Sequence, residues 1–100
     1  NVGPVNQITI PRGATVFDLT GKSLLPGLID AHTHIAIVDT RFFAQNVDYP
    51  GAIYPYAVAQ NLKSTLHAGF TTIRDAGGCD WSFKLAVERG MIPGPRMFIS

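Results

Sequence analysis

Two histidines, His32 and His34, are separated by a single residue in the sequence LIDAHTHI, which spans residues 28–35. The apolar residues around them predict a β-strand, in which side chains at positions i and i+2 point to the same face. With a rise of ~3.3 Å per residue, the two backbone positions lie ~6.6 Å apart, so both imidazoles can reach one ion at ~2.0–2.1 Å. Histidines also occur in cores, satisfied by hydrogen bonds, and this alternative stays open.

Two aspartates near predicted strand ends could support such a site. Strict alternation places Asp30 on the face of the histidines, where its carboxylate could orient a ligand or fill a polar interior, and leaves Ile29 on the face that packs under helices. Asp75 follows the second predicted strand, at the same end of the fold. Its carboxylate could contact a ligand from behind, contact a substrate, or cap the turn before Gly77.

Hydrophobic period and turn residues predict the elements that position these side chains. An apolar residue every fourth position from Val58 predicts a helix, and β-branched residues after Gly69 predict a strand. The expected elements are a hairpin or meander between Val5 and Leu25, a strand over 28–35, a long irregular loop over 36–54, a helix over 55–68, a strand over 70–74, a second helix from Asp80 or Ser82 to Gly90, and a strand over 96–99. This alternation predicts an α/β fold with a parallel sheet and crossover helices.

Composition limits the classes of function. Hydrophobic residues make up 46% and charged residues 15% of the 100 residues, which suits parallel strands covered on both faces. The formal net charge is +1 and the charges form no runs, so nothing favours nucleic acid or an anionic membrane surface as a partner. No apolar run reaches the ~18 residues of a membrane span.

The remaining chemistry-bearing residues give weaker signals. Cys79 is the only cysteine, so an internal disulfide is excluded and the redox compartment stays open, with the cytoplasm slightly favoured over secretion. Cys79 is expected to pack rather than to act as a nucleophile. His67 falls in the last turn of the first predicted helix, which favours a surface position. Residues 1–20 lack a basic start followed by an apolar core, but the chain begins at Asn1, so a leader could precede it.

Three segments in order carry a resemblance to a known family. GKSLLPGLIDAHTHI over 21–35 resembles the approach to the first barrel strand of the amidohydrolase superfamily of metal-dependent hydrolases. AGFTTIRDAGG over 68–78 and AVERGMIPGPRMFIS over 86–100 are similar to the second strand and the approach to the third, closest to the branch of imidazolonepropionase-like proteins, Xaa-Pro dipeptidases and ochratoxinase-like amidases. The resemblance implies the N-terminal part of a (β/α)₈ TIM barrel over residues 26–100, preceded over residues 1–25 by strands of a small β-sandwich domain.

The same resemblance implies a site and an activity. His32 and His34 would ligate a divalent metal, with zinc as the favoured ion and one or two ions bound, and Asp30 and Asp75 would be supporting residues behind the ligands. The family's other ligands, a carboxylated lysine, two later histidines and a late aspartate, match no position here, so no catalytic acid or base is assigned in this segment.

The implied reaction is hydrolysis of an amide or peptide C–N bond by metal-activated water, in a dipeptide, a C-terminal residue or an N-acyl amino acid. Two alternatives remain: a cyclic amidohydrolase or deaminase with the same metal core, and a non-catalytic metal-binding or interaction module. The expected partner is a small amide or peptide substrate, without nucleic acid or membrane. The full-length enzyme is expected to be a homo-oligomer, and the isolated 100 residues are expected to be inactive.

Overall fold

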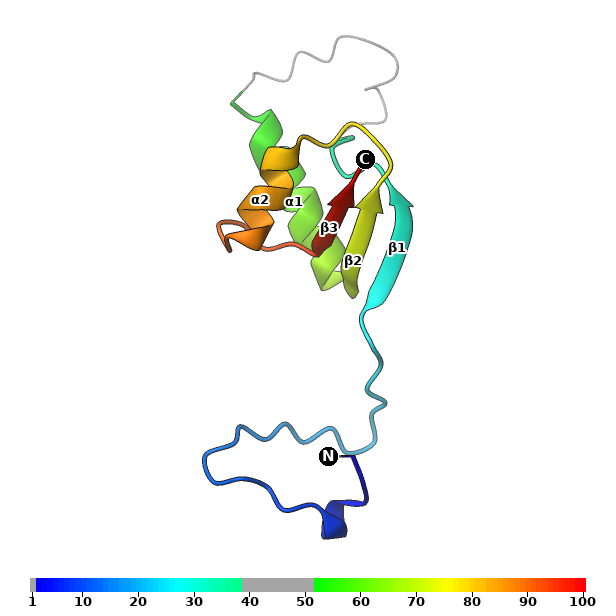
Figure 1. The fold of residues 1–100 in the computed structure, drawn as a ribbon, viewed down its shortest axis with the longest axis vertical. Helices are drawn as coiled ribbons and strands as arrows, with labels where there is room; N and C mark the ends of the chain where they lie inside the picture. The colour runs from blue at the N-terminus through cyan, green and yellow to red at the C-terminus, as the bar shows by residue number, and fades with distance from the viewer. Residues whose placement is uncertain (1, 39–51) are drawn as a thin grey trace.

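The computed structural model describes residues 2–38 and 52–100 (Figure 1). Its elements, in chain order, are a 3₁₀ turn over Val5–Gln7, β1 over Leu28–Thr33, α1 over Tyr54–His67, β2 over Phe70–Asp75, α2 over Trp81–Glu88 and β3 over Arg96–Ile99. The predicted order of strand, helix, strand, helix and strand is therefore confirmed. Of the long loop predicted over 36–54, residues 39–51 lie outside the described residues.

The three strands form one parallel sheet in the order β1-β2-β3. β2 pairs with β3 in an unbroken register from Thr72 opposite Arg96 to Asp75 opposite Ile99. The carboxyl ends of β1 and β2 also meet, because Thr33 pairs with Asp75. The chemistry-bearing residues that follow these two strands therefore share one edge of the sheet, where parallel α/β folds place their sites.

The helices begin and end close to where turn chemistry predicts. Pro55 stands in the first turn of α1, a position that lacks an intrahelical N–H partner, and Gly69 follows the helix with a φ of 97°. Asp80 caps α2, since its carboxylate accepts a hydrogen bond of 2.8 Å from the N–H of Ser82. Both helices lie within two residues of the predicted bounds.

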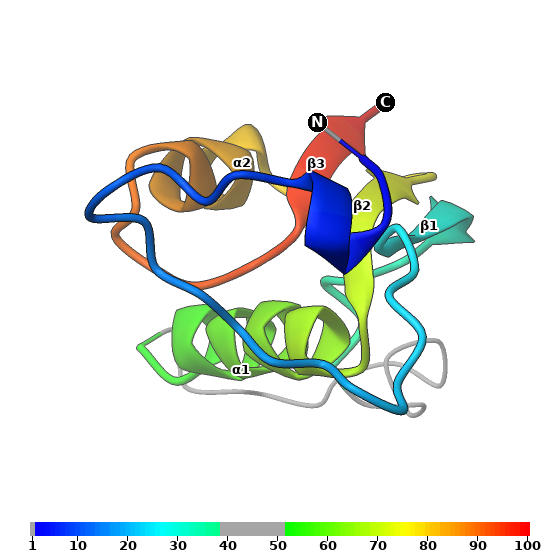
Figure 2. The same ribbon diagram turned by 90° about the horizontal axis from the view of Figure 1, so that it is seen from below.

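Both helices cover the same side of the sheet, as Figure 2 shows. The core between the helices and the sheet consists of these apolar side chains: Ile35, Ala36, Val58, Leu62, Ile73, Phe83 and Met97. Among residues 2–38 and 52–100, no element covers the other side of the sheet, where Ile29 and Phe98 are 71% and 55% exposed. Parallel sheets are normally covered on both faces, so this face has the composition and exposure of a surface that meets further protein.

The hairpin predicted between Val5 and Leu25 is not formed. Residues 2–27 contain the 3₁₀ turn but no strand, and they extend away from the sheet (Figure 1). Nearly every side chain there is exposed, including Val5 and Phe17. A short ribbon with no second layer to cover its apolar face is at most marginally stable, so its alternating pattern is not sufficient to pair it. The assignment of residues 1–25 to a β-sandwich stays a prediction.

The strand that carries the histidines departs from strict alternation. Between Asp30 and Thr33, β1 advances three residues while β2 advances two, from Ile73 to Asp75. This β-bulge reverses the side-chain parity, so Asp30 and Thr33 face the same way. None of the helices among the described residues is long and apolar enough to pass through a lipid bilayer.

Candidate metal centre

His32 and His34 lie together at the carboxyl end of β1. Their ring centroids are 5.2 Å apart and the ring planes meet at 73°, in an edge-to-face arrangement. Both side chains are exposed. The prediction that the two imidazoles share one side of the chain is therefore confirmed, and the predicted extension of the strand to residue 35 is wrong by two residues because β1 ends at Thr33.

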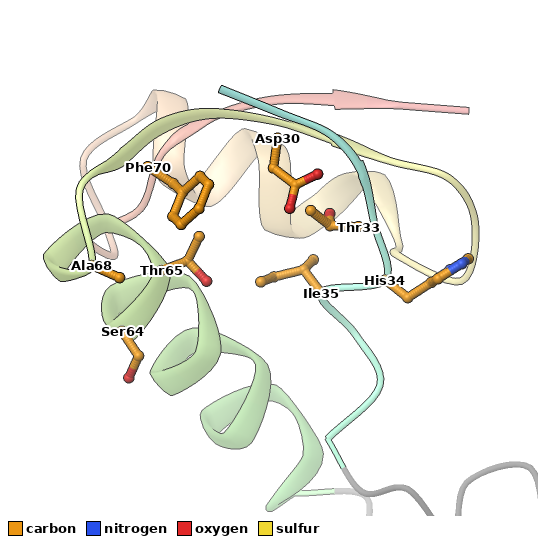
Figure 3. A pocket seen from close by; sticks show the side chains of 8 residues that line it. All are labelled: Asp30, Thr33, His34, Ile35, Ser64, Thr65, Ala68 and Phe70. Carbon is orange, nitrogen blue, oxygen red and sulfur yellow. The ribbon is translucent and has the colours of Figure 1, made fainter. Parts of the chain in front are cut away.

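The ring of His34 is held by the loop after β2. Its Nδ1 atom lies 3.0 Å from the carbonyl oxygen of Gly77. Because a carbonyl oxygen only accepts hydrogen bonds, Nδ1 donates, and the proton on Nδ1 leaves the lone pair on Nε2. Figure 3 shows the His34 ring directed towards this loop. A histidine that ligates a metal through one nitrogen commonly donates from the other to a carbonyl or a carboxylate, so His34 has the environment of a ligand.

The structure places Asp30 differently from the sequence-based expectation. Instead of sharing the face of the histidines, it lies with Thr33 and Ile35 on the side of β1 that faces α1 (Figure 3). The physical reason is the β-bulge, which shifts the alternation by one residue between Asp30 and His34. The contact of Asp30 with the pair is made by the backbone, because its Oδ1 accepts a hydrogen bond of 3.0 Å from the N–H of His32.

Asp75 is fully buried at the same end of the sheet. Its Oδ2 accepts a hydrogen bond of 2.7 Å from the N–H of Ile35, and its Oδ1 accepts one of 2.9 Å from the N–H of Gly77. A buried carboxylate requires such partners, and bonds to an ionised acceptor are among the stronger ones in proteins. The bond to Gly77 confirms the turn-capping interpretation of Asp75, and the bond to Ile35 ties the turn to the residue that follows His34.

A pocket of about 390 Å³ adjoins His34 on the helix side of β1 (Figure 3). Its lining combines apolar residues with a few polar side chains: Asp30, Thr33, His34, Ile35, Ser64, Thr65, Ala68 and Phe70. His34 lines it and His32 does not, so the pocket lies beside the histidine pair rather than between the rings. The pocket therefore flanks the candidate metal centre and is not itself the reaction site.

The structure places His67 on the surface, as predicted, and Cys79 in a partly buried position. His67 is exposed in the last turn of α1. Cys79 is partly buried, and its thiol lies 3.6 Å from the carbonyl oxygen of Asp80. Burial first, and then the negative charges of Asp75 and Asp80, raise the pKa of the Cys79 thiol to about 11, so it is protonated at neutral pH and a poor nucleophile.

The donor set fits half of a metal site. Two neighbouring imidazoles, one of them with its Nδ1 occupied by a carbonyl, suit a borderline-soft divalent ion such as zinc. A protein zinc site uses three or four protein ligands, however, and residues 2–38 and 52–100 contain no group of three histidine, cysteine, aspartate or glutamate side chains able to hold an ion. Further ligands would have to come from beyond these residues.

One functional group was not predictable from residue types. The Gly77 carbonyl is a backbone atom, and no side chain marks it in the sequence. The available signal was the pair Gly77–Gly78, where φ is 142° and 94°, because such a turn directs its peptide groups in ways that other residues rarely allow.

The chain is similar to known proteins over most of its length. The model of the amidohydrolase family matches residues 23–100. An imidazolonepropionase from Deinococcus radiodurans is 33% identical over 69 residues, which cover 67% of this chain and 17% of that protein. A dihydroorotase from Lactobacillus helveticus is 34% identical over 61 residues, which cover 61% of this chain and 12% of that protein.

Solved structures give the same family. A prolidase complexed with N-methylphosphonate-L-proline has a TM-score of 0.81 and 38% identity, over 93% of this chain and 22% of that one. A Xaa-Pro dipeptidase with bound methionine has a TM-score of 0.62 and 27% identity, over 75% of this chain and 19% of that one. The A. niger ochratoxinase has the same TM-score and identity, over 75% of this chain and 18% of that one. The chain thus spans less than a quarter of the length of these relatives.

Proposed function

The chain belongs to the amidohydrolase family, and on this premise we propose that it supplies His32 and His34 as metal ligands to an enzyme that hydrolyses an amide or peptide C–N bond. The observation that carries the proposal is the geometry of the pair: two rings 5.2 Å apart at a strand end, with Nδ1 of His34 donating to Gly77. This arrangement leaves the Nε2 lone pair of His34 free to bind an ion.

The residues of this chain would bind and orient, while proton transfer falls to residues outside it. A bound zinc ion lowers the pKa of water to ~7 and polarises a carbonyl oxygen, which is the chemistry that amide hydrolysis needs. His32 and His34 would ligate as neutral imidazoles, and a ligating nitrogen neither accepts nor releases a proton. The number of ions bound depends on ligands beyond these residues.

Small peptide-like amides are the favoured substrate class. A prolidase structure is similar over 93% of this chain, and a Xaa-Pro dipeptidase is similar over 75% of it. A second candidate is hydrolysis of a cyclic amide, which the similarity to an imidazolonepropionase and a dihydroorotase favours. Substrate choice in a barrel depends on several βα loops, of which this chain holds only the first ones.

The test uses the full-length protein and its metal content. The double variant His32→Ala and His34→Ala is expected to lose bound metal, measured by elemental analysis after dialysis, and to lose turnover with it. His67→Ala is the matched control, because it removes an exposed histidine at the far end of α1 and should leave metal content unchanged. Full metal content in the double variant would contradict the proposal. Assays with Xaa-Pro dipeptides and with cyclic amides separate the two substrate classes.

A further inference from the structure

We propose that Asp75 is a positioning residue, which fixes the orientation and the tautomer of His34 through the carbonyl group of Gly77. The metal-directed part of this inference rests on the proposed function, since it assumes that His34 is a ligand. A connected set of hydrogen bonds joins the carboxyl ends of β1 and β2 around His34.

Three hydrogen bonds from the end of β2 and the residues after it fix His34 and its neighbours. The carbonyl oxygen of Thr33, before the histidine, accepts a hydrogen bond of 2.8 Å from the N–H of Ala76. The N–H of Ile35, after the histidine, donates a hydrogen bond of 2.7 Å to Oδ2 of Asp75. The His34 ring donates a hydrogen bond of 3.0 Å to the carbonyl oxygen of Gly77. The backbone on both sides of His34 and the ring are thus held by consecutive residues of one turn.

Asp75 joins two of these three contacts. Its Oδ2 accepts a hydrogen bond from the backbone beside His34, and its Oδ1 accepts one from the N–H of Gly77, the residue whose carbonyl oxygen accepts a hydrogen bond from the His34 ring. Gly77 has a φ of 142°, a conformation that other residues rarely adopt, so the turn requires glycine at this position. The carboxylate is 0% exposed, so solvent water does not compete for either bond.

Helix α1 also holds the backbone next to His34. The side-chain amide of Asn61 in α1 donates a hydrogen bond of 3.1 Å to the carbonyl oxygen of Ile35, so both the N–H and the carbonyl group of Ile35 have partners. With Ile35 itself 8% exposed in the core, the chain after His34 has little freedom to rotate. The remaining freedom of His34 is its ring rotation and tautomer, and the Gly77 carbonyl determines both by accepting only from a protonated Nδ1.

The first measurement determines the tautomer of His34 in the wild-type sequence. In full-length protein labelled with ¹⁵N-histidine and stripped of metal by a chelator, NMR should show His34 protonated on Nδ1 and unprotonated on Nε2, with His34→Gln assigning the signal. The amides of Ile35 and Gly77 should be protected from hydrogen exchange. Protonation of His34 on Nε2, or rapid exchange of both amides, would overturn the inference.

The second measurement uses Asp75→Asn, which preserves size but replaces one acceptor with a donor. We expect the His34 tautomers to interconvert and zinc affinity, measured by chelator competition, to weaken about tenfold or more. Asp80→Asn is the matched control, since that carboxylate also accepts from the N–H two residues on but has no link to His34. A wild-type tautomer and zinc affinity in Asp75→Asn would overturn the inference and leave the proposed function intact. If the wild type binds no zinc at the pair, the proposed function fails, and the tautomer alone decides the role of Asp75.

Discussion

The carboxylate of Asp75 accepts a hydrogen bond of 2.7 Å from the N–H of Ile35, across a separation of 40 residues. Strand pairing between β1 and β2 ends at Thr33 opposite Asp75, so beyond that point a side chain continues the connection that the backbone ladder no longer makes. The bond lies in the buried end of the core, between two residues that are 0% and 8% exposed. It therefore couples the stability of the sheet to the geometry of the candidate metal centre.

Replacing Asp75 by alanine should destabilise the fold. The substitution leaves the N–H groups of Ile35 and Gly77 without their acceptor, and an unsatisfied buried donor costs ~1–3 kcal/mol. We expect the free energy of unfolding of the full-length protein to fall by roughly 2–4 kcal/mol in urea titrations. Asp80→Ala, which removes an exposed helix cap, should cost clearly less. Equal losses in the two variants would show that burial of Asp75 contributes nothing.

Asp30→Asn should leave zinc binding nearly unchanged. Asparagine keeps the Oδ1 atom that accepts from the N–H of His32, and the side chain lies on the α1 side of β1, away from the rings. Chelator competition should therefore show a loss of less than about tenfold, below the effect expected of Asp75→Asn. A loss of tenfold or more would restore Asp30 to the supporting role that strict alternation assigns to it.

The Cys79 thiol should react slowly and only at high pH. Burial, followed by the charges of Asp75 and Asp80, raises its pKa from the ordinary 9.0 to about 11. A rise of this size lowers the thiolate fraction at pH 8 about a hundredfold, and the thiolate is the reactive form. Labelling of the folded full-length protein by a disulfide reagent, with Cys79→Ser as the blank, should show this slow phase, and urea should abolish it. Labelling as fast as that of a small thiol would contradict the prediction.

The raised pKa of the Cys79 thiol makes the stability of the fold depend on pH. The folded state holds the Cys79 proton more tightly than the unfolded state, so the contribution to stability is complete below pH of about 9 and is lost as the pH rises to about 11. The melting temperature of the wild type should therefore fall more steeply over this window than that of Cys79→Ser. Parallel curves for the two proteins would show that the thiol titrates alike in both states.

The fold from Leu28 onwards was predictable because its local signals agree with one another. The four-residue period from Val58, Pro55 at the start and Gly69 after the end all indicate the same helix, and it forms over Tyr54–His67. The segment before Leu28 alternates apolar and polar residues, but no strand among the described residues pairs with it. A strand exists only when another strand pairs with it, so its sequence pattern alone does not determine its structure.

The proximity of the two histidine rings was predictable from the sequence, and the contacts that support His34 were not. His32 and His34 are two residues apart, a spacing short enough for strand geometry to bring them together. The contacts behind them depend on a β-bulge and on the path of the turn at Gly77, and neither has a residue signature that periodicity detects. Asp30 was therefore expected on the wrong face, while the link from Asp75 to His34 could only be found from the three-dimensional arrangement.

Gly27→Ala should disrupt the entry into β1. A Cβ atom at residue 27 would overlap the side chain of Thr71 on the neighbouring strand, with 2.6 Å to the Thr71 Cβ, an atom close to the backbone that cannot swing aside. Forcing a methyl group into such a contact typically costs about 1–3 kcal/mol, and here the strain would fall where Leu28 begins its pairing. Urea unfolding of the full-length protein measures the loss.

Gly94→Ala is the control for this prediction. Its Cβ would meet the Cγ2 of Val87 at 2.9 Å and the Cβ of Leu62 at 3.2 Å, contacts that a small shift of the β3 approach relieves. We expect Gly94→Ala to be the milder of the two. Combined with Thr71→Ala, Gly27→Ala should regain part of its lost stability, because the overlapping Oγ1 and Cγ2 atoms are then removed while the Cβ of residue 71 remains. Failure of this rescue would mean that residue 27 requires glycine for its backbone and not for the space beside Thr71.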